Sequence, residues 1–182
     1  MIFEYETPRL ILKVLDSSYA TAILKFVQKN KEVFEPYESL KSSSFYTIDY
    51  QTDLVQAEYN AFLSLKYIRY YAFLKENPDL IIGTVSFYNI LPQPYCSCTT
   101  GYKIDREHWH MGYGSEMVHA AVDTMLSDFG IHRIEAYVMN GNIYSAKLLE
   151  SIGFENEGIA HKSIKVNGSY KDHLRYAIVA PE

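Results

Sequence analysis

Two glycines separated by one residue stand where an apolar helix is about to begin. Gly112 and Gly114 flank Tyr113, and glycine lets the backbone adopt positive φ and lets a ligand approach with no Cβ in the way. The N–H groups of a first helical turn lack helical partners and carry about half a positive charge of helix dipole, which stabilises a phosphate. We therefore expect the N–H groups of Met111, Gly112, Tyr113, Gly114 and Ser115 to bind a pyrophosphate. A tight turn with no ligand is the simpler alternative.

The residues around this loop differ from two common phosphate-binding motifs. No Gly-Lys-Ser/Thr follows Gly114, so the segment is not a P-loop. The third glycine of the dinucleotide fingerprint is also missing, and the strands before the loop are predicted to be antiparallel.

Two pairs of potentially reactive side chains precede the loop. Cys96 and Cys98 are one residue apart in a predicted strand, where a relaxed disulfide is rare, and we expect two small strand residues in a reducing compartment. His108 and His110 flank Trp109, but no third ligand follows at zinc spacing, so we expect no metal. Trp109 itself is expected to pack under the loop.

Composition restricts the class of protein. A length of 182 residues predicts a single domain over residues 1–182, and 48% apolar residues are enough for a core. No apolar run reaches the roughly 20 residues that span a bilayer, and the N-terminus lacks the basic start of a signal peptide. We therefore expect a cytoplasmic protein with no membrane partner. A net charge of −5 argues against nucleic acid as a partner.

The pattern along the chain predicts seven strands and four helices. The strands are expected at residues 7–14, 70–74, 80–90, 95–104, 133–139, 158–166 and 170–179, with turns at 77–79 and 167–168. The helices are expected at about residues 16–28, 49–65, from the glycine loop to 129, and 143–152. Both later helices join strands, as a βαβ crossover requires. The fold class is therefore mixed α/β.

The motifs of the chain together resemble one enzyme family. Trp109-x-x-Gly112-Tyr113-Gly114-Ser115-Glu116 resembles the coenzyme A loop of the GNAT acetyltransferases, and its details resemble the ribosomal-protein N-terminal acetyltransferase (Rim) branch. Further matches follow in order along nearly the whole chain: Thr7-Pro8-Arg9-Leu10, Ile82-Gly83, Gly101-Tyr102, Arg133-Ile134-Glu135-Ala136, Asn142-x-x-Ser145, Gly153-Phe154, Glu157-Gly158 and Asp172. The resemblance implies a central, twisted, mostly antiparallel sheet with a V-shaped splay for acetyl-CoA.

The resemblance also implies roles for individual residues. Backbone groups of Lys103 and Ile104 would face the pantetheine arm and thioester, where an N–H stabilises the developing negative charge. Asn142 would touch the coenzyme, although it can equally be a helix N-cap. Ser145 would protonate the departing thiolate, because Leu149 stands where many GNAT enzymes carry a tyrosine acid. A helix-capping hydroxyl is the alternative for Ser145.

The acceptor side is less defined by the sequence. Glu35 and Tyr37 lie in a loop that resembles the substrate wall of the family. The carboxylates of Glu35, Asp105, Glu107 and Glu135 are candidates for the general base, with Glu135 favoured as structural. Ile164 stands where the Rim branch can carry a glutamate base, so we assign no base.

These expectations define the reaction. We expect acetyl transfer from acetyl-CoA to a primary amine, by direct attack in a ternary complex and without a metal. The Rim resemblance favours a protein N-terminus as the acceptor. A small-molecule amine such as a polyamine, amino sugar or antibiotic is the first alternative, and a non-catalytic acyl-CoA-binding module is the second. The family resemblance also allows a homodimer.

Overall fold

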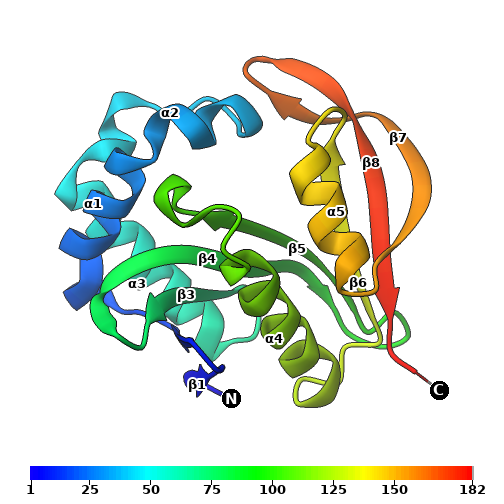
Figure 1. Ribbon diagram of the computed structural model, residues 1–182, viewed down its shortest axis with the longest axis horizontal. Helices are drawn as coiled ribbons and strands as arrows, with labels where there is room; N and C mark the ends of the chain where they lie inside the picture. The colour runs from blue at the N-terminus through cyan, green and yellow to red at the C-terminus, as the bar shows by residue number, and fades with distance from the viewer. Residues whose placement is uncertain (182) are drawn as a thin grey trace.

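A single sheet of eight strands carries the elements of this protein, whose computed structural model describes residues 1–181 (Figure 1). The strand order is β1-β2-β3-β4-β5-β6-β8-β7, and all neighbours are antiparallel except β5 and β6. The strands are β1 Glu4–Glu6, β2 Leu10–Lys13, β3 Ile68–Leu74, β4 Asn77–Leu91, β5 Ser97–Ile104, β6 Arg133–Met139, β7 Glu155–Val166 and β8 Ser169–Val179. The expected mixed α/β class and mostly antiparallel sheet are confirmed.

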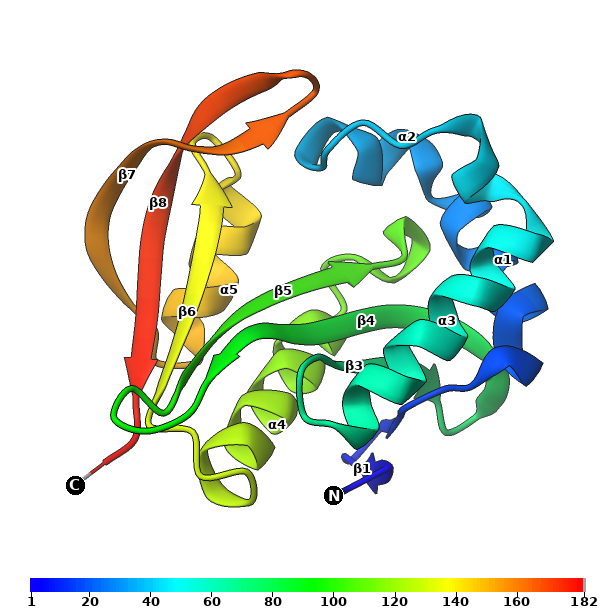
Figure 2. The ribbon, with the colours of Figure 1, turned by 180° about the vertical axis from the view of Figure 1, so that it is seen from behind.

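Helices cover both faces of the sheet. They are α1 Ala20–Lys29, α2 Lys31–Phe34, α3 Ile48–Leu63, α4 Tyr113–Ser127 and α5 Ile143–Ser151. Helices α4 and α5 lie on the face toward the viewer in Figure 1, and α1 and α3 cover the opposite face in Figure 2. Val118, Val122 and Met125 of α4 are buried against the sheet. No helix within residues 1–181 is both long and apolar enough to cross a membrane.

The sheet divides between β5 and β6. These strands pair in parallel only from Ser97–Thr100 to Arg133–Ala136, yet β5 continues to Ile104 and β6 to Met139. The crossover helix α4 connects them, and beyond Thr100 the two strands separate, which Figure 1 shows as an open V. The splay expected from the family resemblance is therefore present.

Several local predictions need correction. The sheet has an eighth strand, β1, which pairs with β2, and a short additional helix, α2. The turn between β3 and β4 falls at Lys75-Glu76 instead of Asn77-Pro78-Asp79, because Leu74 already pairs with Asn77. The hairpin turn at Asn167-Gly168 is confirmed, with φ of 47° and 80°.

Candidate active site

The loop before α4 presents free backbone donors. Gly112 is the N-cap of α4 with φ of 79°, in the left-handed region that favours glycine. The first helical bond runs from the Glu116 N–H to the Gly112 carbonyl oxygen at 3.1 Å. The N–H groups of Tyr113, Gly114 and Ser115 precede that bond and have no acceptor within residues 1–181. Gly112 is exposed, so solvent can reach the loop whose N–H groups are predicted to bind an anion.

Gly114 lies in a closely packed position. A Cβ at this position would lie 3.0 Å from Leu148 Cδ1 on α5 and 3.4 Å from Ile104 Cγ1 on β5. The missing side chain therefore lets the start of α4 approach both elements that border the splay.

Arg9, from the segment before β2, braces the loop from outside. Its Nε lies 2.6 Å from Glu116 Oε2, its Nη1 donates to the Met111 carbonyl oxygen at 2.9 Å, and its guanidinium stacks on the Tyr113 ring. Glu116 Oε1 also accepts from Thr7 Oγ1 at 2.6 Å and from the Arg9 N–H at 2.8 Å. Burial alone would raise the pKa of Glu116, but these donors outweigh it and hold the pKa below its ordinary value. The sequence contains the Thr7-Pro8-Arg9-Leu10 motif and the glycine loop, but it does not indicate that these two segments are in contact.

At the end of β5 that is not paired with β6, the backbone N–H and C=O groups of every second residue face the splay. The Asp105 N–H donates to the Ile82 carbonyl oxygen at 2.8 Å, toward β4. Because antiparallel strands alternate, the backbone of Lys103 also faces β4, whereas Tyr102 and Ile104 face the splay. Of the two residues expected here, Ile104 therefore presents its backbone to the splay and Lys103 presents its backbone to β4; contact with the coenzyme stays a prediction.

Trp109 is placed differently from the expectation. Its indole Nε1 donates to the Ile104 carbonyl oxygen at 2.8 Å, and its side chain is partly exposed instead of packed under the loop. The indole therefore occupies the acceptor atom of Ile104 and leaves the Ile104 N–H as the remaining backbone group at the end of β5.

The Lys103 side chain points toward the segment that follows α2. Its Nζ contacts Glu38 Oε1 and lies 5.3 Å from the Phe34 ring centroid. Burial lowers the pKa of Lys103, and the nearby Arg69 lowers it further, against the opposing effect of Glu38. The side chain thus contacts the segment after α2, where acceptor residues were expected.

Helix α5 begins beside the splay with Asn142 and Ser145. The Asn142 Oδ1 accepts from the Ser145 N–H at 3.3 Å, so Asn142 is an N-cap, and its contact with a coenzyme stays a prediction. The Ser145 Oγ lies 2.8 Å from the Tyr102 hydroxyl of β5. Leu149 is fully buried in the core, so no hydroxyl reaches the splay from that position.

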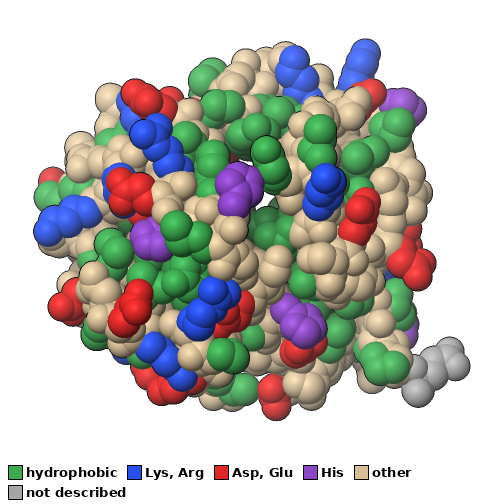
Figure 3. Space-filling model, viewed as in Figure 1, with side chains coloured by type: hydrophobic (Ala, Val, Ile, Leu, Met, Phe, Trp, Pro, Cys, Tyr) green, Lys and Arg blue, Asp and Glu red, His purple; other side chains and the backbone are tan. Residues whose placement is uncertain are grey.

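The segment after α2 touches the β7–β8 hairpin. The Asn167 N–H donates to the Glu38 carbonyl oxygen at 3.3 Å, and Ser39 Oγ donates to the Lys165 carbonyl oxygen at 3.0 Å. We call this contact between residues 38–39 and 165–167 the bridge; Figures 1 and 2 show the two segments meeting beyond the open end of the splay. Figure 3 shows a recess at the centre of the same face.

Glu35 and Tyr37 lie next to the bridge in a short 3₁₀ turn. Glu35 Oε1 accepts from the Tyr46 hydroxyl at 3.0 Å, and Tyr37 is exposed. Burial and the Glu35 carboxylate raise the pKa of Tyr46 to about 12. Their role in acceptor binding stays a prediction.

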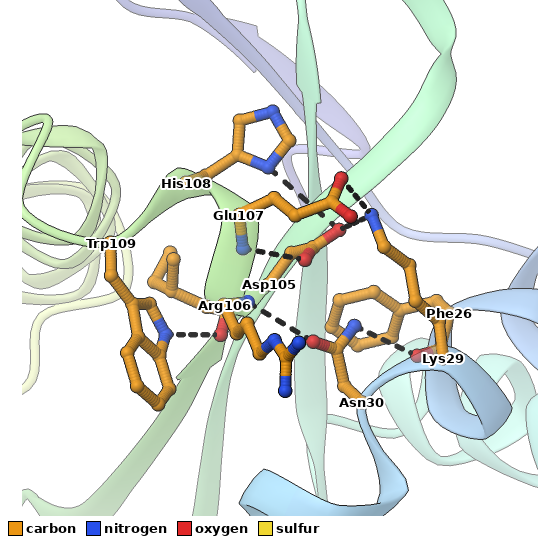
Figure 4. A network of polar contacts seen from close by, with 9 residues as sticks. Phe26, Lys29, Asn30, Asp105, Arg106, Glu107, His108 and Trp109 are labelled. Atoms are coloured by element: carbon orange, nitrogen blue, oxygen red, sulfur yellow. Dashed lines mark hydrogen bonds and ion pairs between the residues drawn. The ribbon is translucent and has the colours of Figure 1, made fainter.

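The remaining candidate bases are engaged in structural contacts. Asp105 is fully buried, and its carboxylate binds Lys29 Nζ at 2.6 Å and the Glu107 N–H at 3.1 Å (Figure 4). Glu107 is exposed and pairs with Lys29 at 2.7 Å, and Glu135 pairs with Arg133 at 2.9 Å. This network joins the end of α1 to the segment before the glycine loop.

Asn30 completes the same junction. Its Oδ1 accepts from the Arg106 N–H at 3.1 Å, and its Nδ2 donates to the Phe26 carbonyl oxygen at 3.0 Å (Figure 4). Because Asn30 is almost fully buried, these bonds fix α1 against the segment before the glycine loop.

The cysteines and histidines lie in separate surroundings. Cys96 precedes β5 with φ of 42°, and burial raises the pKa of the Cys98 thiol to about 12. The His110 ring packs edge-on to Tyr144 at 4.8 Å, and His108 packs against Tyr113. Within residues 1–181, no group of three or more His, Cys, Asp or Glu side chains is arranged to hold a metal ion.

A split sheet with free amides on one strand and at the start of a neighbouring helix offers hydrogen-bond donors to an extended, anionic ligand. Comparisons with known proteins agree with this geometry. The model of the acetyltransferase (GNAT) domain matches residues 9–155. A probable N-acetyltransferase of Bacillus subtilis, YjcK, is 31% identical over 173 residues, which cover 95% of each chain.

Two further relatives match over nearly their whole length. The [ribosomal protein uS5]-alanine N-acetyltransferase of Escherichia coli is 28% identical over 177 residues, covering 97% of this chain and 90% of that protein. The crystal structure of the ribosomal-protein-S5-alanine acetyltransferase from Vibrio fischeri has a TM-score of 0.92 at 27% identity, covering 98% of this chain and 97% of that one. The chain belongs to the GNAT acetyltransferase family and is an acetyl-CoA-dependent N-acetyltransferase.

Proposed function

We propose that this enzyme acetylates the α-amine of a protein N-terminus in the cytoplasm, in a ternary complex with acetyl-CoA and without a metal. The observation that carries the cofactor site is the end of β5–β6 pairing at Thr100, which leaves the last residues of β5 unpaired on that side, next to the start of α4 at Ile104 and Gly114. The N–H groups of Tyr113, Gly114 and Ser115 have no acceptor within residues 1–181. The protein acceptor is supported by the relatives that modify ribosomal protein uS5.

The residues divide into a cofactor side and an acceptor side. The N–H groups from Met111 to Ser115 would bind the pyrophosphate, and Asn142 would lie along the coenzyme. The Ile104 N–H would hold the thioester oxygen as negative charge develops. Glu35 and Tyr37, next to the bridge, would border the acceptor.

Ser145 is the proposed donor to the sulfur that leaves. The amine attacks the thioester carbon directly, and no cysteine carries the acetyl group, because Cys98 is buried with a raised pKa and Cys96 precedes β5, at the opposite end of the strand from Ile104. An acetylated protein formed from acetyl-CoA without acceptor would contradict direct transfer.

The decisive experiment measures thiol release from acetyl-CoA with alanine- and serine-initiated peptides, spermidine and an aminoglycoside. We expect turnover with a peptide and loss of it when the peptide N-terminus is blocked. Turnover confined to spermidine or the aminoglycoside would reject the protein acceptor. Coenzyme A binding with no thiol release from any amine would reject transfer.

A further inference from the structure

A second hydroxyl group lies beside Ser145 at the edge of the splay. The Tyr102 hydroxyl is 2.8 Å from Ser145 Oγ and 3.1 Å from the Ser145 carbonyl oxygen. Tyr102 comes from β5 and Ser145 from α5, so the contact joins the strand and the helix that border the splay. Both residues are half-buried, which leaves the pair accessible to a ligand between β5 and β6.

The number of protons on each hydroxyl sets the direction of the hydrogen bond. A serine hydroxyl has one proton and two lone pairs. If Ser145 donates its proton toward a ligand sulfur, its Oγ can only accept from Tyr102. If Ser145 donates to Tyr102 instead, no proton is left for the sulfur. Tyr102 also has a single proton, which can go to Ser145 Oγ at 2.8 Å or to the Ser145 carbonyl oxygen at 3.1 Å. Only donation to Oγ leaves the serine proton for the sulfur, because a tyrosine that donates to the carbonyl oxygen must accept from Ser145.

We propose that Tyr102 is a positioning residue that donates to Ser145 Oγ and thereby directs the serine proton to the sulfur of coenzyme A. This inference rests on the proposed transfer reaction and on the proposed role of Ser145. When the C–S bond breaks, its electron pair stays on sulfur, and the Ser145 O–H donates a hydrogen bond to that thiolate. The attacking amine loses its proton to solvent, and solvent later protonates the thiolate.

Tyr102 keeps its own proton throughout this sequence. Burial raises the pKa of Tyr102 well above its ordinary value of 10, so its phenolate is not formed at neutral pH. The tyrosine therefore acts through Ser145. Tyr102 places a hydroxyl at the splay from β5, whereas Leu149 of α5 has no hydroxyl to place there.

The test measures the acidity of the bound thiol and needs no acceptor. Coenzyme A bound to excess protein is alkylated with iodoacetamide across a pH series, and mass spectrometry of the coenzyme A adduct gives the rate and hence the pKa of the bound thiol. We compare the wild type with Tyr102→Phe, Ser145→Ala and the double variant. Tyr70→Phe is the matched control, since it removes a buried strand hydroxyl that donates to the Ile2 carbonyl oxygen at 2.8 Å.

A donor aimed at sulfur stabilises the thiolate. We therefore expect the thiol pKa to rise by about one unit in both single variants, which is a tenfold change in the equilibrium, and no further in the double variant. Tyr70→Phe should leave the thiol pKa unchanged. An unchanged pKa in Tyr102→Phe, or a rise in the double variant equal to the sum of the single effects, overturns the role of Tyr102 while transfer stands. Failure of the wild type to bind coenzyme A in calorimetry overturns both proposals.

Discussion

The guanidinium carbon of Arg9 lies 4.3 Å from the centroid of the Tyr113 ring, so the segment before β2 covers the outer side of the cofactor loop. The same guanidinium pairs with Glu116 and donates to the Met111 carbonyl oxygen. Residues more than 100 positions apart in the chain thus fix the loop that presents the free amides.

Replacing Arg9 with alanine should weaken coenzyme A binding by about tenfold, or about 1.4 kcal/mol. The change removes the stacking on Tyr113 and the bond to Met111, so the loop must be ordered by the ligand itself. Calorimetric titration with coenzyme A measures the effect. Lys13→Ala, which removes one positive charge from the neighbouring strand β2, is the control for net charge. Equal weakening in both variants would attribute the effect to charge alone.

Gly112→Ala should lower both stability and coenzyme A affinity. An alanine at φ of 79° costs roughly 1–2 kcal/mol, and its Cβ would lie 3.2 Å from Arg9 Nη2. Gly130→Ala is a matched control, because Gly130 also has positive φ (66°) but has open space and lies at the other end of α4. Urea unfolding should show a loss in both variants, whereas only Gly112→Ala should weaken binding. Equal affinities of the two variants for coenzyme A would contradict a role for the Gly112 conformation in binding the pyrophosphate.

The Glu116 carboxylate should make stability depend on pH in the acid range. Its folded pKa lies below the ordinary value of 4.5, so its contribution to stability is complete above the unfolded pKa and is lost as pH falls through the folded pKa. We expect the stability difference between the wild type and Glu116→Gln to be largest near pH 6 and to shrink below pH about 4. Urea unfolding between pH 3 and 7 measures it. A constant difference over that range would show that Glu116 is not held ionised by Thr7 and Arg9.

Asp105→Asn and Glu107→Gln should differ sharply, although both carboxylates bind Lys29. Asp105 is fully buried and also accepts from the Glu107 N–H, so its loss should cost about 1–3 kcal/mol. The Glu107 side chain is 66% exposed, and its loss should change stability by less than about 0.5 kcal/mol. Thermal unfolding of the two variants gives the comparison. Similar losses in both would contradict the structural role assigned to Asp105.

Much of this fold could be predicted from local patterns in the sequence. Helix α5 follows Asn142, and β6 has the predicted bounds with alternating burial, because capping and alternation are local signals. Strand β1 was not predicted, since three residues between polar ends have little pattern of their own and are ordered by pairing with β2. Helix α2 is only four residues long and contains no buried residue, so it has no apolar stripe to recognise.

The candidate site could be predicted in part. The free amides follow from glycine spacing and the start of a helix, which are properties of consecutive residues. The orientation of Lys103 depends on the register of β5 against β4, and the contacts of Tyr102 with Ser145 and of Arg9 with Glu116 depend on tertiary packing. Spacing along the chain contains no information on either.

The division between β5 and β6 leaves two groups of strands, β1–β5 and β6–β8, whose shared ladder runs only from Ser97–Thr100 to Arg133–Ala136 within residues 1–181. A ligand with amide groups of its own can take the place of the absent strand and continue the ladder across the gap. The amide hydrogens of Tyr102 and Ile104 should therefore exchange with deuterium quickly in the free enzyme and slowly with acetyl-CoA, while that of Lys103, which faces β4, exchanges slowly in both. On this view the cofactor is also a structural element that couples the two groups of strands.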